Sequence, residues 1–276
     1  DLKVTRSGGD LIIEHKTGVL EVLSRSGSRS DEWLASRIYS PEGRVIYLDY
    51  RVVAGRRLLS GIRDESQALL TTDMRGGAGQ VSSITLWPES PADQLTFQLQ
   101  QQNGELTKIT LALDNGALLS WRLRYETVNG LRLINRLELP TDGFETITYR
   151  PAALRLPSGA PVTALPAVRS HTSFPRSNQP PITREYSYSA KNYLGYGSNA
   201  RWRNYGDNLY RATGNYEYET YEDLVVGSGS NRRTLRRTKR VYNRFHLQVE
   251  ETINQNGKTV RNRTEYHEKP GLSFEN

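Results

Sequence analysis

The sequence contains no cysteine, a single methionine and no long run of apolar residues. Without cysteine, neither a disulfide-stabilised fold nor a metal site built on thiolates can form. No stretch approaches the roughly 18 apolar residues that a membrane-spanning helix requires, and no secretory signal segment is visible. Because the sequence starts at Asp1 rather than Met, we expect a piece of a longer protein whose targeting signals lie elsewhere.

Hydrophobic residues are also scarce, at 36% of the 276 residues, and the mean hydropathy is −0.65. The 16 tyrosines and 4 tryptophans compensate in part, because each adds apolar area under a polar tip. A chain of this length can bury a core as one large unit or as two domains.

Positive charge is abundant, with a net charge of +7 and a pI near 9.5. Arginine supplies nearly all of it, since 30 arginines stand against 7 lysines. The one dense cluster spans residues 232–240, RRTLRRTKR. Such a run indicates a solvated strand face with long side chains. Phosphate binding is the alternative, but it is unspecific, and we do not expect nucleic acid as a partner.

Strand patterns dominate the chain, and helical signals are nearly absent. Short alternating runs bounded by Gly, Asn, Asp or Pro recur about every ten to twelve residues, which is typical of an antiparallel all-β fold. The best helical candidate is a short turn over residues 31–36, DEWLAS. We therefore predict an all-β protein of antiparallel hairpins, arranged as a meander in an extended, curved sheet.

The clearest hairpin lies in residues 241–267, where two alternating runs meet at Asn256-Gly257. Asn-Gly favours a two-residue type I′ turn, because both central positions need positive φ. This turn places Ile253 opposite Val260 and Glu250 opposite Arg263. It also places His246 and His267 together on the polar face, although no further metal ligands are visible there.

An internal repeat relates two segments of the first half. YRVVAGRRLLSGI (50–62) aligns without gaps on YETVNGLRLINRL (125–137), so that a Tyr, a turn Gly and a strand recur in the same order. A hairpin unit of this kind cannot bury a face alone and is expected to stack beside others.

Residues 151–181 contain seven of the twelve prolines. Proline lacks the N–H that a central strand needs, so this segment is expected to be extended coil or an edge. We therefore predict three regions: hairpin repeats over 1–150, a proline-rich linker over 151–181, and a tyrosine-rich β region over 182–276 that ends in the Asn256-Gly257 hairpin.

No catalytic constellation is apparent. The four histidines lie in hairpins or coil, and none belongs to a nucleophile elbow or a zinc-binding helix. The glycines of 194–197, LGYG, precede no predicted helix and so do not form a phosphate loop. We predict no catalytic residue, no metal site, no cofactor and no enzymatic activity.

One long loop, residues 192–208, is rich in Gly, Asn and aromatic residues. Flat aromatic faces beside amide and guanidinium groups are typical of sugar-stacking or base-stacking sites. The other interpretation is that these rings fill a loop-covered core. The candidate ligand-binding residues of this loop and its C-terminal flank are Tyr193, Tyr196, Trp202, Tyr205 and Tyr210.

Several blocks, taken in order, resemble one stretch of the RHS/YD-repeat family, which includes secreted polymorphic toxins and the B and C components of insecticidal toxin complexes. The blocks are HKTGVLEVL (15–23), SPEGRV (40–45), LDY (48–50), NYLGYG (192–197), GDNLYR (206–211), GNYEY (214–218), YNRFHL (242–247) and TEYH (264–267). The order of the blocks is more specific than any one of them.

The resemblance implies a strip of antiparallel sheet that, with further repeats, forms a hollow shell around a toxic C-terminal effector. It implies a secreted protein, with the remaining repeats and the effector as partners. The sequence departs from the family in lacking tandem Y-D-x-x-G-R repeats, an aspartyl autocleavage motif and a variable toxin tail, so we expect a non-catalytic module from the N-terminal side. The alternative function is a carbohydrate-binding module that uses the aromatic residues of 192–210, with glycans as partners.

Overall fold

The computed structural model describes residues 2–25, 32–75, 79–176, 179–227 and 229–266. The fold is all-β and open, as predicted, with nineteen strands joined by antiparallel pairings. Two single-turn 3₁₀ helices, Leu209–Arg211 and Gly229–Asn231, are the only helical elements in the described ranges. None of the described helices has the length and apolarity needed to cross a membrane.

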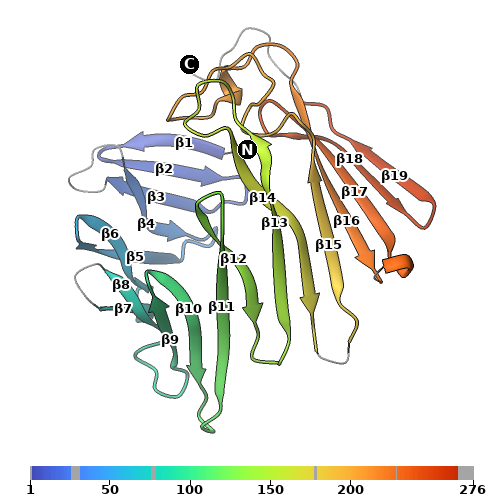
Figure 1. Ribbon diagram of the computed structural model, residues 1–276. Helices are drawn as coiled ribbons and strands as arrows, with labels where there is room; N and C mark the ends of the chain where they lie inside the picture. The colour runs from blue at the N-terminus through green and yellow to red at the C-terminus, as the bar shows by residue number, and fades with distance from the viewer. Residues whose placement is uncertain (1, 26–31, 76–78, 177–178, 228, 267–276) are drawn as a thin grey trace. The chain divides into compact units, whose positions relative to one another are not determined.

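The chain divides into two compact units, Asp1–Trp121 and Arg122–Asn276. This boundary differs from the region limits at 150 and 181 that the sequence suggested. In the first unit each strand pairs with the next in the chain (Figure 1). Its strands are β1 (Leu2–Ser7), β2 (Asp10–His15), β3 (Leu20–Arg25), β4 (Trp33–Tyr39), β5 (Val45–Val53), β6 (Arg56–Arg63), β7 (Ala68–Arg75), β8 (Gln80–Leu86), β9 (Leu95–Gln102) and β10 (Glu105–Ala112).

The second unit follows the same rule of consecutive antiparallel pairing. Its first strand, β11, begins just before the boundary between the units. Its strands are β11 (Leu118–Val128), β12 (Leu131–Glu138), β13 (Phe144–Arg155), β14 (Ala164–Phe174), β15 (Ile182–Tyr188), β16 (Glu217–Val226), β17 (Arg233–Asn243), β18 (Gln248–Gln255) and β19 (Lys258–Arg263).

The predicted helical turn over residues 31–36 is wrong from Trp33 onward, because these residues begin strand β4; Asp31 lies outside the described residues. Pairing with β3 decides the conformation, since Leu34 lies opposite Ser24 in the ladder. The Trp33 ring also packs under two guanidinium groups, those of Arg6 and Arg25. Tertiary contacts of this kind override a weak local helix signal.

The Asn256-Gly257 hairpin is confirmed. Both turn residues have positive φ, at 51° and 71°, and the register pairs Ile253 with Val260 and Glu250 with Arg263. The strand on its N-terminal side, however, is shorter than predicted, because a turn over residues 244–247 separates β17 from β18.

That turn is stabilised by its own first residue. The Asn243 Oδ1 atom accepts hydrogen bonds from the N–H groups of Phe245 and Leu247, and His246 adopts a left-handed conformation with φ of 60°. His246 therefore lies in a turn and not on a strand face. The predicted pairing of His246 with His267 involves a residue outside the described ones.

The internal repeat extends well beyond the two copies visible in the sequence. In six successive hairpins, from β3–β4 to β13–β14, the register shifts by one residue on the second strand. The first five bulged residues recur at intervals of 22 to 28 positions: Ser36, Ser60, Ser82, Thr107 and Asn135. A bulge bends its strand and increases the local twist, so each hairpin repeats the same bend.

Four of these bulges share one hydrogen bond. The side-chain hydroxyl of the bulged residue donates to the carbonyl of the partner-strand residue just before the register shift: Ser36 to Val22, Ser60 to Asp49, Ser82 to Asp73 and Thr107 to Gln100. The bulge interrupts the backbone ladder at this point, and the hydroxyl supplies a donor there. Asn135 occupies the fifth position, and its Oδ1 atom is the buried polar side-chain atom without a hydrogen-bond partner in the described chain.

The proline-rich segment is extended coil only in part: residues 156–163 lie outside any strand, whereas residues 151–155 belong to β13. Residues 164–174 form β14, a central strand paired with both β13 and β15. Two prolines fit because they lie where the β13–β14 ladder is interrupted: the register jumps from Arg150 to Leu154, leaving Pro151 and Pro166 outside the paired positions. Bulges of this kind tolerate the missing N–H.

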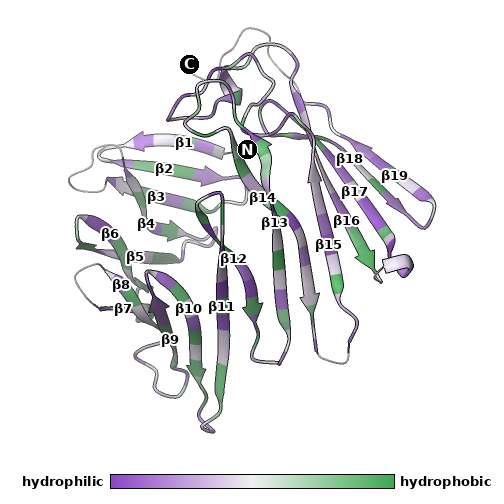
Figure 2. Ribbon diagram, in the orientation of Figure 1, coloured by the Kyte–Doolittle hydropathy of each residue, from purple (hydrophilic) through white to green (hydrophobic). Residues whose placement is uncertain are grey.

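Few residues are fully buried. Figure 2 shows apolar and polar residues interleaved along the strands, and most strand positions are partly exposed. The tightest packing lies in the second unit, where Leu209, Ala212, Tyr216 and Tyr218 form a buried cluster. The strands therefore make a thin sheet, and one local core supports the site described next.

The Ser60 hydroxyl tests the contribution of the bulge hydrogen bond. Replacing Ser60 with Ala removes the donor to the Asp49 carbonyl, so we expect the free energy of unfolding to fall by about 0.5–1.5 kcal/mol, measured by urea denaturation. Ser7→Ala, at the exposed end of β1, is the control and should change it by less than about 0.5 kcal/mol. Equal stabilities for the two variants would show that the hydroxyl does not stabilise the bulge.

Candidate functional site

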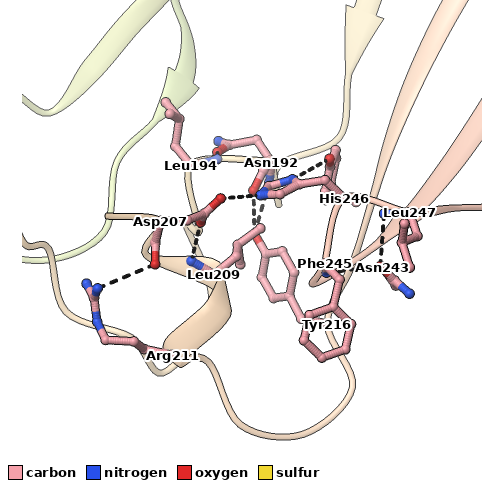
Figure 3. A network of polar contacts seen from close by, with 11 residues as sticks. Asn192, Leu194, Asp207, Leu209, Arg211, Tyr216, Asn243, Phe245, His246 and Leu247 are labelled. Carbon is pink, nitrogen blue, oxygen red and sulfur yellow. Dashed lines mark hydrogen bonds and ion pairs between the residues drawn. The ribbon is translucent and has the colours of Figure 1, made fainter. Parts of the chain in front are cut away.

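The connection between β15 and β16, residues 189–216, is an ordered loop held by a buried tyrosine. The Tyr216 hydroxyl lies 2.9 and 2.6 Å from the carbonyls of Asn192 and Tyr196, which share its one hydrogen, and it accepts the Asn192 N–H at 3.0 Å. The Asn192 side chain in turn donates to the Arg155 carbonyl and accepts the Leu194 N–H. This network fixes the first part of the loop on the end of β13. Figure 3 shows Tyr216, Asn192 and Leu194 within it.

The middle of the loop is fixed by a short turn. The Asp207 carboxylate accepts the N–H of Leu209 at 2.7 Å, and the Asn208 side-chain oxygen accepts the N–H of Arg203 at 2.9 Å. Leu209 then enters the buried cluster and is fully shielded from solvent. Asp commonly bonds the backbone N–H two residues on, which explains its use at position 207. Asn208 instead reaches back five residues and joins two parts of the loop.

A second contact fastens this turn to the turn between β17 and β18. His246 Nε2 lies 2.5 Å from the Asp207 carboxylate, and His246 Nδ1 lies 2.9 Å from the Tyr218 hydroxyl. In the neutral ring, Nε2–H donates to the carboxylate and Nδ1 accepts from the phenol. The left-handed backbone of His246 directs its ring to this position. We call Asp207, His246 and Tyr218 the loop lock.

The loop lock contains a carboxylate, an imidazole and a phenol, as a proton relay would, but the properties of the phenol fit a structural contact. Burial raises the pKa of the Tyr218 phenol well above its ordinary value, and the nearby Tyr242 and Asp207 add to the increase. The phenol therefore stays protonated and donates its hydrogen, and it is a poor base or nucleophile. The Tyr218 ring also stacks on Tyr242, with centroids 5.2 Å apart.

The predicted ligand-binding aromatics are dispersed over the loop surface. Tyr205 is 76% exposed, and Tyr193 and Tyr210 are 45% and 43% exposed. Trp202 donates its indole N–H to Asn204, and Arg155 donates to the Tyr196 hydroxyl while lying over that ring. Tyr210 packs near Phe245 and His246. A binding role for these five residues stays a prediction, because no shared binding surface emerges from their described contacts.

The rings that fill the loop core are Tyr216 and Tyr218, which the sequence did not single out as site residues. A signal was present, because GNYEY (214–218) places two tyrosines on one face of the following strand. Their partners lie far away in the sequence, since Tyr216 bonds to Asn192 at a distance of 24 positions and Tyr218 to His246 at 28 positions, so the sequence alone gave no reason to connect them.

A polar groove of about 740 Å³ lies over β16–β19. Cross-strand ion pairs cover its floor: Lys239 Nζ lies 2.7 Å from the Glu219 carboxylate, and Arg261 pairs with Glu250. Tyr221 donates its hydroxyl to Glu219 as well. The hydrogen bond from Lys239 lowers the pKa of the Glu219 carboxyl, with the Tyr221 bond contributing. Opposite charges on neighbouring strands thus neutralise one another in the groove.

The basic cluster 232–240 is also largely paired. Five of its six cations lie within ion-pair distance of a carboxylate: Arg232 to Glu185, Arg236 to Glu222, Arg237 to Asp223, Lys239 to Glu219, and Arg240 to Glu251 and Glu222. The Arg237–Asp223 pair is bidentate, at 2.7 and 2.6 Å. The cluster therefore forms a ladder across strands and is more than a solvated face.

The other described histidines each pair with a carboxylate on the adjacent strand. His15 lies 2.7 Å from Glu21, and His171 lies 3.0 Å from Glu145. Throughout the described ranges, no group of three or more His, Cys, Asp or Glu side chains gathers closely enough to hold a metal ion.

Comparisons with known proteins found weak structural similarity and no match in sequence. No protein-family model and no curated protein matches the sequence. Among solved structures, the chain is similar to one chain of the crystal structure of TcdB2-TccC3-Cdc42, with a TM-score of 0.36 and 9% identity. The similarity covers 91% of this chain and 16% of the other, so this chain spans about a sixth of that length. A likeness this weak does not assign the chain to a family.

The loop lock should contribute measurable stability. Tyr218→Phe leaves His246 Nδ1 without its donor, so we expect the free energy of unfolding to fall by about 1–2 kcal/mol and the loop 192–210 to be cleaved faster by trypsin. Tyr205→Phe, in an exposed part of the same loop, is the matched control and should behave as wild type. Unchanged cleavage of Tyr218→Phe would contradict the fastening role.

The Lys239–Glu219 pair should make stability depend on acidity. Because the folded-state pKa of Glu219 lies below its ordinary value of 4.5, its contribution is present above pH 4.5 and is lost as the pH falls through the lowered pKa. Glu219→Gln removes this contribution, so its unfolding free energy should fall less steeply than that of wild type below pH 4.5. Parallel urea titrations between pH 3 and 6 measure the two slopes, and identical slopes would contradict the assignment.

Proposed function

We propose that this chain is a structural segment of the β-sheet shell of a secreted RHS-repeat toxin, and that it helps to enclose a C-terminal toxic effector without catalysing a reaction. The observation that carries the proposal is the run of six hairpins, from β3–β4 to β13–β14, each with a one-residue bulge within its second strand. A repeated bend in a repeated unit curves the strands of each unit in the same way, as a shell segment requires.

The distribution of burial supports a wall. Most strand positions are only partly exposed, and fully buried apolar residues are few for a chain of this length. A sheet that is wet on both faces can separate two polar spaces. The groove over β16–β19, with its paired charges, presents such a polar surface to whatever faces it.

The motif order in the sequence supports the family. Within the second unit, GDNLYR (206–211), GNYEY (214–218) and YNRFHL (242–247) supply the loop lock and its buried tyrosines. Three of the eight blocks that resemble the RHS/YD-repeat family thus help to hold the loop on the sheet. The partners in this proposal are further repeats of the parent protein and its effector.

The proposal predicts protease protection in the parent protein. We expect the effector segment to resist trypsin while the sheet is intact, and to be digested after Val241→Pro, because this substitution removes a backbone N–H at a buried position of β17, a strand that pairs on both sides. Tyr205→Ala, at an exposed loop position, is the control and should keep the protection. Equal digestion of the effector in wild type, control and Val241→Pro would overturn the enclosing role.

A further inference from the structure

We infer that the outer edge of β19 is a docking site for an acidic β-strand, with carboxylates at alternate positions. The inference deepens the proposed function and rests on it, since a strand from the same parent would continue the sheet at this edge. In the second unit β19 pairs with β18 along one side, and it lies at the outer end of the strand sequence (Figure 1). All six of its residues are exposed.

The geometry of the hairpin identifies the backbone groups that point outward. A two-residue turn makes Gln255 and Lys258 a hydrogen-bonded pair, and every second residue after Lys258 then faces β18. The bond from the Thr264 N–H to the Val249 carbonyl agrees with this alternation. The N–H and C=O groups of Thr259, Arg261 and Arg263 therefore point away from β18, ready to pair with a further strand.

The side chains of those same three residues share one face of the strand. Arg261 and Arg263 lie on the groove side, whereas Val260, 56% exposed, lies on the opposite face. Arg261 already pairs with Glu250. Of the carboxylates in the described part of the chain, none lies within ion-pair distance of Arg263. An added strand with two carboxylates on the groove side and an apolar residue against Val260 would complete both faces.

Charge decides among the possible occupants. β19 carries Lys258, Arg261 and Arg263 and no carboxylate, so pairing with β19 of a second copy would set arginine against arginine. Cations on an edge strand protect against such self-pairing. A phosphate polymer would match the arginines but leave the outward carbonyls without donors. An acidic strand satisfies both the charges and the backbone.

The test uses a fluorescein-labelled peptide with the order Thr-Glu-Val-Glu-Val-Thr-Ser, which in antiparallel pairing sets its glutamates opposite Arg263 and Arg261. We expect saturable binding to the 276-residue protein by fluorescence anisotropy, weakening as salt rises. The same peptide with lysine for both glutamates should bind at least about tenfold more weakly, a difference of about 1.4 kcal/mol. Absence of binding at millimolar peptide, or equal binding of the lysine peptide, would overturn the inference.

Two variants distinguish the contribution of side-chain charge to peptide binding from that of backbone hydrogen bonding. Arg263→Glu reverses the charge. Thr259→Pro removes an outward N–H and leaves the backbone bonds to β18 in place, although it also removes the side-chain bond from Thr259 to Asn254. Each variant should weaken binding at least about tenfold. Arg56→Glu, the same charge reversal at an exposed residue of the first unit, should leave binding within about twofold of wild type. Circular dichroism verifies that each variant is folded, and unchanged binding of folded Thr259→Pro would overturn the strand-pairing geometry.

The outcomes distinguish this inference from the proposed function. Peptide binding together with an unprotected effector in the parent would retain the docking edge and reject the shell. Effector protection together with no peptide binding would retain the shell and reject an acidic neighbour at β19.

Discussion

The hydrogen-bonded ladder between consecutive strands is the constraint on which this structure depends. A sheet with few fully buried side chains cannot rely on a large apolar core, so its stability comes mainly from backbone pairing, partial burial on both faces and polar contacts across strands. Any local irregularity in the ladder must then be satisfied where it occurs. The bulge hydroxyls of Ser36, Ser60, Ser82 and Thr107 do this in four hairpins.

The same requirement explains the loop lock. A 28-residue connection between two neighbouring strands, residues 189–216, carries many backbone groups that the sheet cannot satisfy. Asp207, Asn208 and Tyr216 form bonds within the loop. Asn192 ties the loop to β13 through the Arg155 carbonyl, and His246 links Asp207 to Tyr218 of β16. Polar side chains thus provide hydrogen-bond partners for the backbone groups of the loop, as the ladder does for those of the strands. The buried leucine, alanine and tyrosines shield these bonds from water.

The parts of the fold that follow local rules could be predicted from the sequence. The Asn256-Gly257 turn sets its own register, and the match between 50–62 and 125–137 indicated a repeated hairpin. The sequence also carried a sign of the wider repeat, because Ser36, Ser60, Ser82 and Thr107 are each followed two residues later by isoleucine, and Asn135 by leucine. That sign is too short to stand out without the register shifts that give it meaning.

The candidate site was much less predictable, for a physical reason. His246 contacts Asp207 from 39 positions away and Tyr218 from 28 positions away, and an alternating pattern placed His246 on a strand. The sequence cannot reveal that Asn243 bonds two following N–H groups strongly enough to interrupt that strand. The prediction of coil over 151–181 failed in part for a similar reason. The proline content gave no sign that a bulge would accommodate Pro151 and Pro166 within the paired hairpin β13–β14.

The pairing of charged side chains between strands explains how an arginine-rich sequence fits this sheet. In β16–β18, the cations of the 232–240 cluster find carboxylates on the next strand, so an arginine-rich sequence forms a neutral ladder. At β19 the sequence still supplies cations, but no further described strand follows to supply carboxylates. Part of the net charge of +7 therefore lies on β19, whose cations have no carboxylate-bearing strand on their outer side in the described chain. The pattern set by the inner strands supports the proposed acidic neighbour, because an acidic strand matches the cations of this edge better than a second copy of the chain does.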